Sequence, residues 1–159
     1  MICEKLEGTL EEINVTGKNI EYVEIEWHEA LKKIHKKVTD KGQEVGIRMG
    51  DWVLTRGLYE GDIIYKDDTT VIAVHTPPCE VIQISVDQKH PMMIAKVCYE
   101  IGNRHAPLFY GENIYTFVTP YNEPMFVMLS KMDGISVEKT EQRLDYKNKI
   151  SETIHNHHH

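Results

Sequence analysis

The chain has 159 residues, of which 41% are hydrophobic, and this is enough apolar material for one ordinary domain or two small domains. Its formal net charge is −7, and acidic and basic residues are interspersed rather than gathered into a basic stripe, which argues against nucleic acid as a partner. No apolar run approaches the ~20 residues that a membrane-spanning helix needs, and the first residues lack the apolar core of a signal peptide. We therefore expect a cytoplasmic globular protein that does not contact membranes.

Short strand-like runs separated by turn-forming residues make up the first half of the chain. The runs cover residues 22–27, 31–39, 44–49, 62–65 and 70–75. Residues 31–38 also fit the apolar spacing of a helix, but the turn-forming Asp40, Lys41 and Gly42 that follow favour a hairpin. Residues 1–76 are thus predicted to form a small all-β domain.

Pro77 and Pro78 are predicted to mark a domain boundary, because proline cannot sit inside a regular strand and stiffens the chain. The pattern after them predicts, in order, a strand at 80–86, a helix at about 88–101, strands at 108–110 and 113–118, a helix at 123–131 and a strand near 134–139. This β-α-β-β-α-β order is that of a ferredoxin-like fold, which we expect for residues 79–144. The fold class is therefore α+β, with an all-β N-terminal domain and a ferredoxin-like C-terminal domain.

The first of these helices has a clear apolar face and a predicted end. Its face is formed by apolar residues at positions i, i+3, i+4 and i+7, namely Ile94, Val97, Cys98 and Ile101. Gly102 and Asn103 are expected to end the helix, since both tolerate the left-handed conformation that is common at helix C-termini.

His105 follows this helix on a predicted loop, directly before Ala106 and Pro107. Functional groups concentrate on loops that rigid elements position, and a neutral imidazole is a suitable ligand for nickel, copper and zinc. The alternative is a histidine that only hydrogen-bonds the end of its own helix. Spacing alone favours this structural role, because a single histidine is no metal signature.

The residues that lead to His105 change this weighting, because they carry a family resemblance. They read Tyr99-Glu100-Ile101-Gly102-Asn103-Arg104-His105, which resembles the signature of the urease accessory protein E family, and the similarity extends over residues 1–144. The resemblance implies a nickel metallochaperone that delivers Ni(II) for urease assembly, with an N-terminal domain similar to the peptide-binding domain of a heat-shock cochaperone. It also implies a homodimer in which His105 of two chains shares one nickel ion. The implied partner is a GTP-hydrolysing urease accessory protein within the urease maturation complex.

A second candidate metal site lies at the end of the sequence. Beyond Lys139 the sequence is polar, and residues 145–159 are expected to form a flexible tail. Four of its last five residues are histidines, namely His155, His157, His158 and His159. Clustered imidazoles would bind Ni(II), and in vitro also Zn(II) or Cu(II), and would raise the metal concentration near His105. The alternative is an engineered affinity tag, although Asn156 interrupts the run.

The remaining histidines are interpreted as ordinary surface or partly buried residues. They are His28, His35, His75 and His90, which lie in predicted strands, in turns or at a helix start. No histidine occurs between His105 and His155, so we do not expect a second fixed metal site within the fold.

Cysteine and methionine are also interpreted as structural. The cysteines, Cys3, Cys79 and Cys98, lack the CxxC spacing of a thiolate metal site and suit reduced thiols. The methionines Met92, Met93, Met125, Met128 and Met132 have helical spacing and apolar neighbours. That pattern favours core packing or a dimer surface over a copper site.

The sequence contains no GxSxG, HExxH or Walker motif, so we do not expect an enzyme. The main alternative to a nickel carrier is a chaperone-like scaffold that binds partner proteins and binds metal only incidentally. A small metal hydrolase is the weakest hypothesis, because a catalytic zinc ion normally has three protein ligands and only His105 is well placed.

Overall fold

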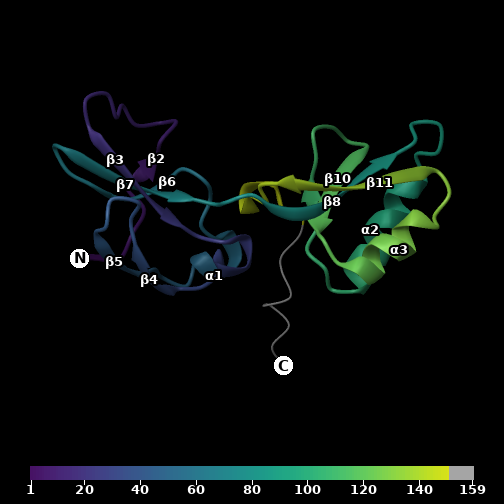
Figure 1. Ribbon diagram of the computed structural model, residues 1–159, viewed down its shortest axis with the longest axis horizontal. Coiled ribbons are helices and arrows are strands. Elements are labelled where there is room, and N and C mark those ends of the chain that lie inside the picture. The colour runs from purple at the N-terminus through teal and green to yellow at the C-terminus, as the bar shows by residue number, and fades with distance from the viewer. Residues whose placement is uncertain (151–159) are drawn as a thin grey trace. The chain divides into compact units, whose positions relative to one another are not determined.

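The computed structural model describes residues 1–150, which form two compact units (Figure 1). The N-terminal unit contains Met1–Pro77 together with Asp145–Lys147, and the C-terminal unit contains Pro78–Leu144 and continues from Asn148. Within the described residues, no helix is long and apolar enough to cross a membrane.

Two small sheets form the N-terminal unit. The first has the strand order β1-β5-β4, formed by Ile2–Cys3, Glu44–Arg48 and Ile34–Val38. The second has the order β2-β6-β7-β3, formed by Gly8–Thr9, Asp62–Lys66, Thr70–His75 and Asn19–Glu24. Apolar side chains from both sheets, including Val23, Ile47, Ile63 and Ile72, are buried and form the core.

The hairpin predicted around Gly42 is confirmed. β4 pairs with β5 in antiparallel register, and the N–H group of Thr39 donates to the carbonyl oxygen of Gln43 at 2.8 Å. Gly42 has φ 89°, a conformation that glycine adopts without steric cost. The alternative of a helix over residues 31–38 is wrong. Ile34 and Val38, which would have belonged to its apolar face, lie in β4 and are 70% and 58% exposed.

Two short helices in this unit were not predicted. The strand expected to reach Trp27 ends at Glu24, and a 3-10 helix, η1, covers Trp27–Glu29. The Glu29 carboxylate explains the break, because it accepts the N–H of Glu26 at 3.1 Å and an ion pair from Lys37 at 3.0 Å. The other helix, α1, covers Val53–Arg56.

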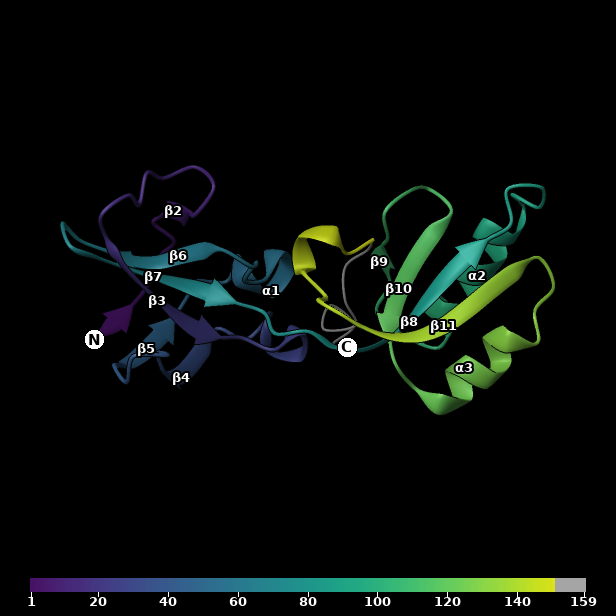
Figure 2. The same ribbon diagram turned by 45° about the horizontal axis from the view of Figure 1, so that its top comes forward.

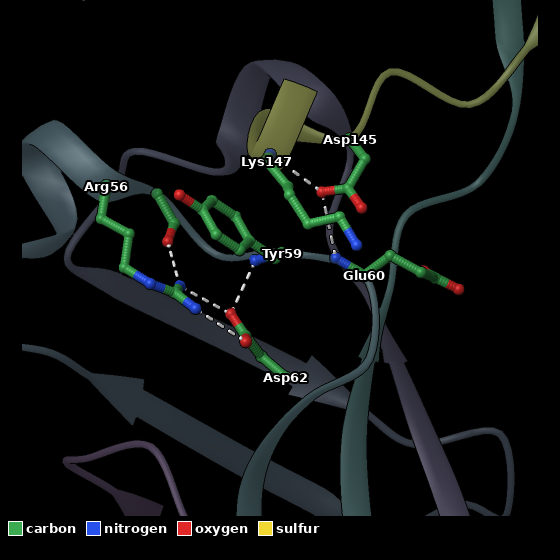
Figure 3. A network of polar contacts seen from close by, with 7 residues as sticks. Arg56, Tyr59, Glu60, Asp62, Asp145 and Lys147 are labelled. Carbon is green, nitrogen blue, oxygen red and sulfur yellow. Dashed lines mark hydrogen bonds and ion pairs between the residues drawn. The ribbon is translucent and has the colours of Figure 1, made fainter. Parts of the chain in front are cut away.

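A partly buried ion pair links α1 to the start of β6 (Figure 3). The Arg56 guanidinium donates to both carboxylate oxygens of Asp62, at 2.8 and 3.0 Å, and Asp62 is fully buried. The N–H group of Tyr59 donates to the same carboxylate at 2.7 Å, and the Tyr59 ring lies 3.8 Å from the guanidinium carbon. These contacts satisfy a charge that would otherwise be costly to bury, and they hold the loop between α1 and β6.

The C-terminal unit has the predicted β-α-β-β-α-β order. Its elements are β8 (Cys79–Val86), α2 (Met93–Asn103), β9 (Phe109–Tyr110), β10 (Thr116–Pro120), α3 (Glu123–Ser130) and β11 (Ile135–Gln142). The antiparallel sheet has the order β11-β8-β10-β9, and both helices cover the same face of it (Figures 1 and 2). The core lies between the two layers and includes Ile82, Ile84, Val97, Ile101, Phe117 and Leu129.

The first helix of this unit begins later than predicted, at Met93 rather than near residue 88. Asp87 organises the preceding turn, since its carboxylate accepts the N–H of Lys89 at 2.9 Å and its carbonyl accepts the N–H of His90 at 2.8 Å. Pro91 follows this turn, two residues before the first residue of the helix, where its missing N–H group breaks no helical hydrogen bond. The hydrogen bonds of this turn therefore keep residues 88–90 out of the helix, although their spacing fits a helical pattern.

The prediction of a flexible tail from residue 145 is wrong for residues 145–150, and the last strand runs further than expected. β11 continues to Gln142, which lies opposite Cys79 on β8. Leu144 and Tyr146 are then buried, with 1% and 4% exposed, and η2 covers Tyr146–Asn148. Isolated apolar residues in a polar stretch produce no periodic pattern, so their burial was not visible in the sequence.

We predict that the N-terminal unit loses stability as the pH falls, because of His35. This residue is 6% exposed, and its Nε2 lies 3.0 Å from the carbonyl oxygen of Lys32. Burial lowers the pKa of His35 below its ordinary value of 6.5, so the unfolded chain takes up the proton first. The stability is therefore complete above about pH 6.5 and decreases as the pH falls toward the lowered pKa.

Chemical denaturation at a series of pH values between about 7 and 5 measures this effect. The wild-type free energy of unfolding should fall by up to about 1.4 kcal/mol per pH unit through this group, and His35→Gln should flatten that slope. His90→Gln changes an exposed histidine and should keep the wild-type slope. Equal slopes in wild type and His35→Gln would contradict the assignment.

Candidate functional site

The C-terminal end of α2 places His105. The N–H group of His105 donates to the carbonyl oxygen of Gly102 at 2.9 Å, and the N–H group of Ala106 donates to that of Ile101 at 3.3 Å. This pair of hydrogen bonds is a Schellman motif, in which the residue after the cap adopts a left-handed conformation. That residue is His105, with φ 59°.

The helix ends where predicted, since Asn103 is the last residue of α2, but neither Gly102 nor Asn103 takes the expected left-handed conformation. Both residues lie within α2, and Gly102 does not have positive φ. Among residues 1–150, His105 is the only non-glycine residue with positive φ. The left-handed conformation costs an L-residue about 1–2 kcal/mol, so a position normally given to glycine here holds a histidine at a conformational cost.

Contacts on both sides of His105 hold its backbone in place. Ile101, whose carbonyl closes the motif, is fully buried in the core. Arg104 folds back along the helix and donates to the carbonyl of Glu100 at 2.9 Å and to its carboxylate at 2.6 Å. The buried Thr119 donates to the carbonyl of Pro107 at 2.8 Å. The side chain of His105 is therefore exposed on a rigidly supported turn.

An exposed stripe of apolar and small residues runs along α2 to this turn. It consists of Met92, Ala95, Tyr99 and Gly102, which follow helical spacing. Met92 is 75% exposed and Tyr99 is 68% exposed. A Cβ atom added at Gly102 would meet nothing within 4 Å, so no contact within the chain requires glycine there. Glycine in a helix costs about 1 kcal/mol relative to alanine.

The described part of the chain supplies His105 as a single candidate ligand. Among residues 1–150, no group of three or more His, Cys, Asp or Glu side chains is placed to hold a metal ion. The other predicted ligands, His155, His157, His158 and His159, lie outside the described residues. An exposed imidazole can bind a divalent metal, but stable coordination needs further ligands from elsewhere.

The chain just before those histidines is held beside the His105 turn. The N–H group of Ile150 donates to the carbonyl oxygen of Leu108 at 2.9 Å, and Lys149 forms an antiparallel bridge with Phe109. Leu108 is three residues beyond His105. Sequence reasoning missed this neighbourhood, because residues 145–150 carry no strand pattern.

The other histidines have local contacts or no cluster around them. His28 packs edge-on against Trp27, with ring centroids 5.6 Å apart, and His35 is buried as described above. The Nδ1 atom of His75 lies 3.0 Å from a carboxylate oxygen of Glu60, and His90 is exposed. Their surroundings fit the ordinary roles predicted for them.

Sulfur side chains take part mainly in packing. The three cysteines form no disulfide, and burial raises the pKa of the Cys3 and Cys98 thiols, which keeps them protonated and poor as ligands. Four of the methionines, Met93, Met125, Met128 and Met132, belong to the C-terminal core or pack against it. Met92 is the exception, since it begins the exposed stripe on α2.

Comparison with known proteins identifies the family. Residues 3–76 match the N-terminal domain of the UreE urease accessory protein, and residues 80–159 match its C-terminal domain. The urease accessory protein UreE of Helicobacter pylori strain P12 is 40% identical over 151 residues, which cover 95% of this chain and 86% of the relative. That of Flavobacterium johnsoniae is 37% identical over 161 residues, which cover 100% and 91%. The chain therefore belongs to the UreE urease accessory protein family and is an accessory protein rather than an enzyme.

Proposed function

We propose that this protein is a nickel-binding metallochaperone that delivers Ni(II) for assembly of the urease active site, with the metal held by His105 between two chains of a homodimer. The observation that carries the proposal is the exposed His105 ring on a left-handed residue of a rigid turn. Costly backbone conformations at non-glycine residues cluster at functional sites. Family membership supplies the connection with urease.

A shared site agrees with the ligand count. One imidazole holds a divalent ion weakly, and a two-fold axis through the metal brings a second copy of His105 without any further sequence. Such a site also leaves coordination positions open. An incoming ligand can then attach before the first ligands leave, which a carrier requires for delivery. Nickel, zinc and copper all accept imidazole, so Zn(II) and Cu(II) are expected to bind in vitro as well.

The exposed stripe on α2 supports a homodimer through the C-terminal unit. Met92 and Tyr99 supply apolar surface of the kind that marks protein interfaces. Gly102 has open space where a Cβ atom would be, which suits the close approach of a second backbone next to His105. The stripe therefore begins with side chains suited to an apolar contact between two chains, and it ends next to His105, the proposed metal ligand.

The tail histidines are proposed as additional ligands. His155 follows Ile150 by five residues, so it can lie no further than about 17 Å from that anchored residue. Because Ile150 is bonded to Leu108, this range includes the neighbourhood of the His105 turn. His157, His158 and His159 would extend the supply of imidazoles.

The proposed partners are the GTP-hydrolysing urease accessory protein and the rest of the urease maturation complex, in the cytoplasm. A transfer partner with thiolate or imidazole ligands would complete the open coordination positions and then take the ion.

A chaperone-like scaffold remains the second candidate, favoured by one feature of the N-terminal unit. A groove of about 730 Å³ lies beside the edge strands β3 and β4, lined by Tyr22, Glu24, Lys37, Val38, Asp40, Glu60 and His75. Strand edges can accept an extended peptide, although on β3 the N–H and carbonyl of Tyr22 are already bonded to Asp40. Partner pull-downs separate the two functions: capture that is independent of nickel and survives His105→Ala favours the scaffold, and nickel-dependent capture favours the carrier.

For the carrier, we predict about one tightly bound nickel ion per dimer. His105→Ala should abolish this tight site, while removal of residues 151–159 should lower only the additional, weaker binding. Calorimetry with nickel and sedimentation of the same samples measure stoichiometry and oligomeric state together. His90→Ala removes another exposed histidine and should bind like wild type. Unchanged tight binding in His105→Ala would disprove the proposal.

A second prediction concerns the conformational cost of His105. His105→Gly should raise the free energy of unfolding by about 1 kcal/mol, because glycine adopts positive φ without strain, and should lose the tight nickel site with the ring. His105→Ala keeps the strain and loses the same ring, so it should not be stabilised. Denaturant titration of the metal-free proteins measures the difference. A His105→Gly protein no more stable than His105→Ala would show that the backbone is not strained.

A further inference from the structure

One ion pair lies at the C-terminal end of α2, directly before the His105 turn, and it joins Glu100 to Arg104. The Nη1 atom of Arg104 donates to a Glu100 carboxylate oxygen at 2.6 Å and to the Glu100 carbonyl oxygen at 2.9 Å. Because Glu100 precedes Arg104 by four residues, these bonds draw the guanidinium about 6 Å back along the helix. A cation that could extend beside His105 is therefore held against α2.

This pair contributes little to the stability of the helix. The side chains of Arg104 and Glu100 are 44% and 30% exposed, and exposed ion pairs four residues apart in a helix are weak. The position of the pair has a larger consequence. Arg104 carries a positive charge on the residue next to the proposed nickel ligand, and the Glu100 carboxylate partly neutralises that charge. The pair is thus placed to act on a metal ion at His105 through charge alone.

The size of this electrostatic effect depends on salt. For a single charge and a doubly charged ion roughly 8 Å apart in water, Coulomb's law gives a change in affinity of about fourfold at about 10 mM salt. At about 150 mM salt, screening reduces the same effect to about twofold. The proposed site joins two chains, so two copies of each charge act on one ion and the factors multiply to about fifteenfold and about fourfold.

We propose that Glu100 and Arg104 set how tightly His105 holds a divalent ion. The Arg104 charge weakens binding and favours release of the ion, and Glu100 holds and partly neutralises that charge, so that binding is kept. The inference rests on the proposed nickel-carrier function and identifies two positioning residues of its site, neither of which is a metal ligand. The two charges act in opposite directions, so their removal should change the affinity in opposite directions.

The test titrates nickel into variants of the full chain at about 10 mM salt and follows the tight site by calorimetry. Arg104→Gln should bind nickel about fifteenfold more tightly and Glu100→Gln about fifteenfold more weakly, and the double variant should bind like wild type because the two changes cancel. Arg104→Lys keeps the charge and should resemble wild type. Circular dichroism and thermal unfolding check that each variant is folded.

Lys96 provides a matched control on the same helix. It is exposed and lies eight residues before Arg104, about 12 Å further along α2 from His105. Lys96→Gln removes the same charge as Arg104→Gln, and it should therefore change the nickel affinity less.

Two further measurements separate the effect of charge from that of a lost structural contact. Raising the salt to about 150 mM should shrink the differences from wild type to about fourfold, because salt screens charge but does not restore a missing contact. Transfer of nickel to an excess of a chelator should be slower from Arg104→Gln than from wild type. If Arg104→Gln does not fold, Glu100→Gln decides the question through its weaker binding and the salt dependence of that binding.

The proposal is refuted if folded Arg104→Gln binds nickel no more tightly than wild type, if both single variants weaken binding, or if the differences persist at the higher salt. Loss of the tight site in His105→Ala together with unchanged affinity in Arg104→Gln and Glu100→Gln would refute this inference alone. Absence of tight nickel binding in wild type would refute the carrier function and this inference with it.

Discussion

The end of α2 is the constraint on which the candidate site depends. Ile101 is buried in the core of the C-terminal unit, and its carbonyl accepts the N–H of Ala106. Once the core fixes Ile101, this hydrogen bond requires the chain to reverse within a few residues, and His105 must take the left-handed conformation that closes the reversal. The packing of one apolar side chain thus determines where an exposed imidazole lies, about one helical turn away.

The surroundings of His105 differ from those of a complete metal centre. A centre that retains its metal is built from several ligands within one fold, and these ligands are fixed by hydrogen bonds from neighbouring groups. Here the described residues bring a single exposed imidazole, and the chain approaching the tail histidines is held nearby through Ile150 and Leu108. An incomplete site on a rigid support suits a protein that must release its metal ion to a partner. The same incompleteness would be a defect in an enzyme.

Prediction from sequence succeeded where the pattern was periodic or a turn residue was decisive. The apolar stripe of α2 and the hairpin at Gly42 are examples, since helix spacing and the conformational freedom of glycine act over a few residues. It failed where a local polar contact competed with the pattern, as at Asp87 before α2 and at Glu29 after β3. It also failed for Tyr146, whose burial depends on Gly57, distant in the chain.

By itself, the sequence determined the order of the C-terminal elements, the family signature and the choice of His105, because these rest on residue types and short spacings. The tertiary structure alone decided that His105, rather than Gly102 or Asn103, is the left-handed residue, since that depends on which carbonyl the buried Ile101 presents. It also decided that residues 145–150 are ordered, with Asp145–Lys147 in the N-terminal unit and Ile150 bonded to Leu108. Contacts between residues far apart in the chain leave no local pattern, and only the folded chain brings their side chains together.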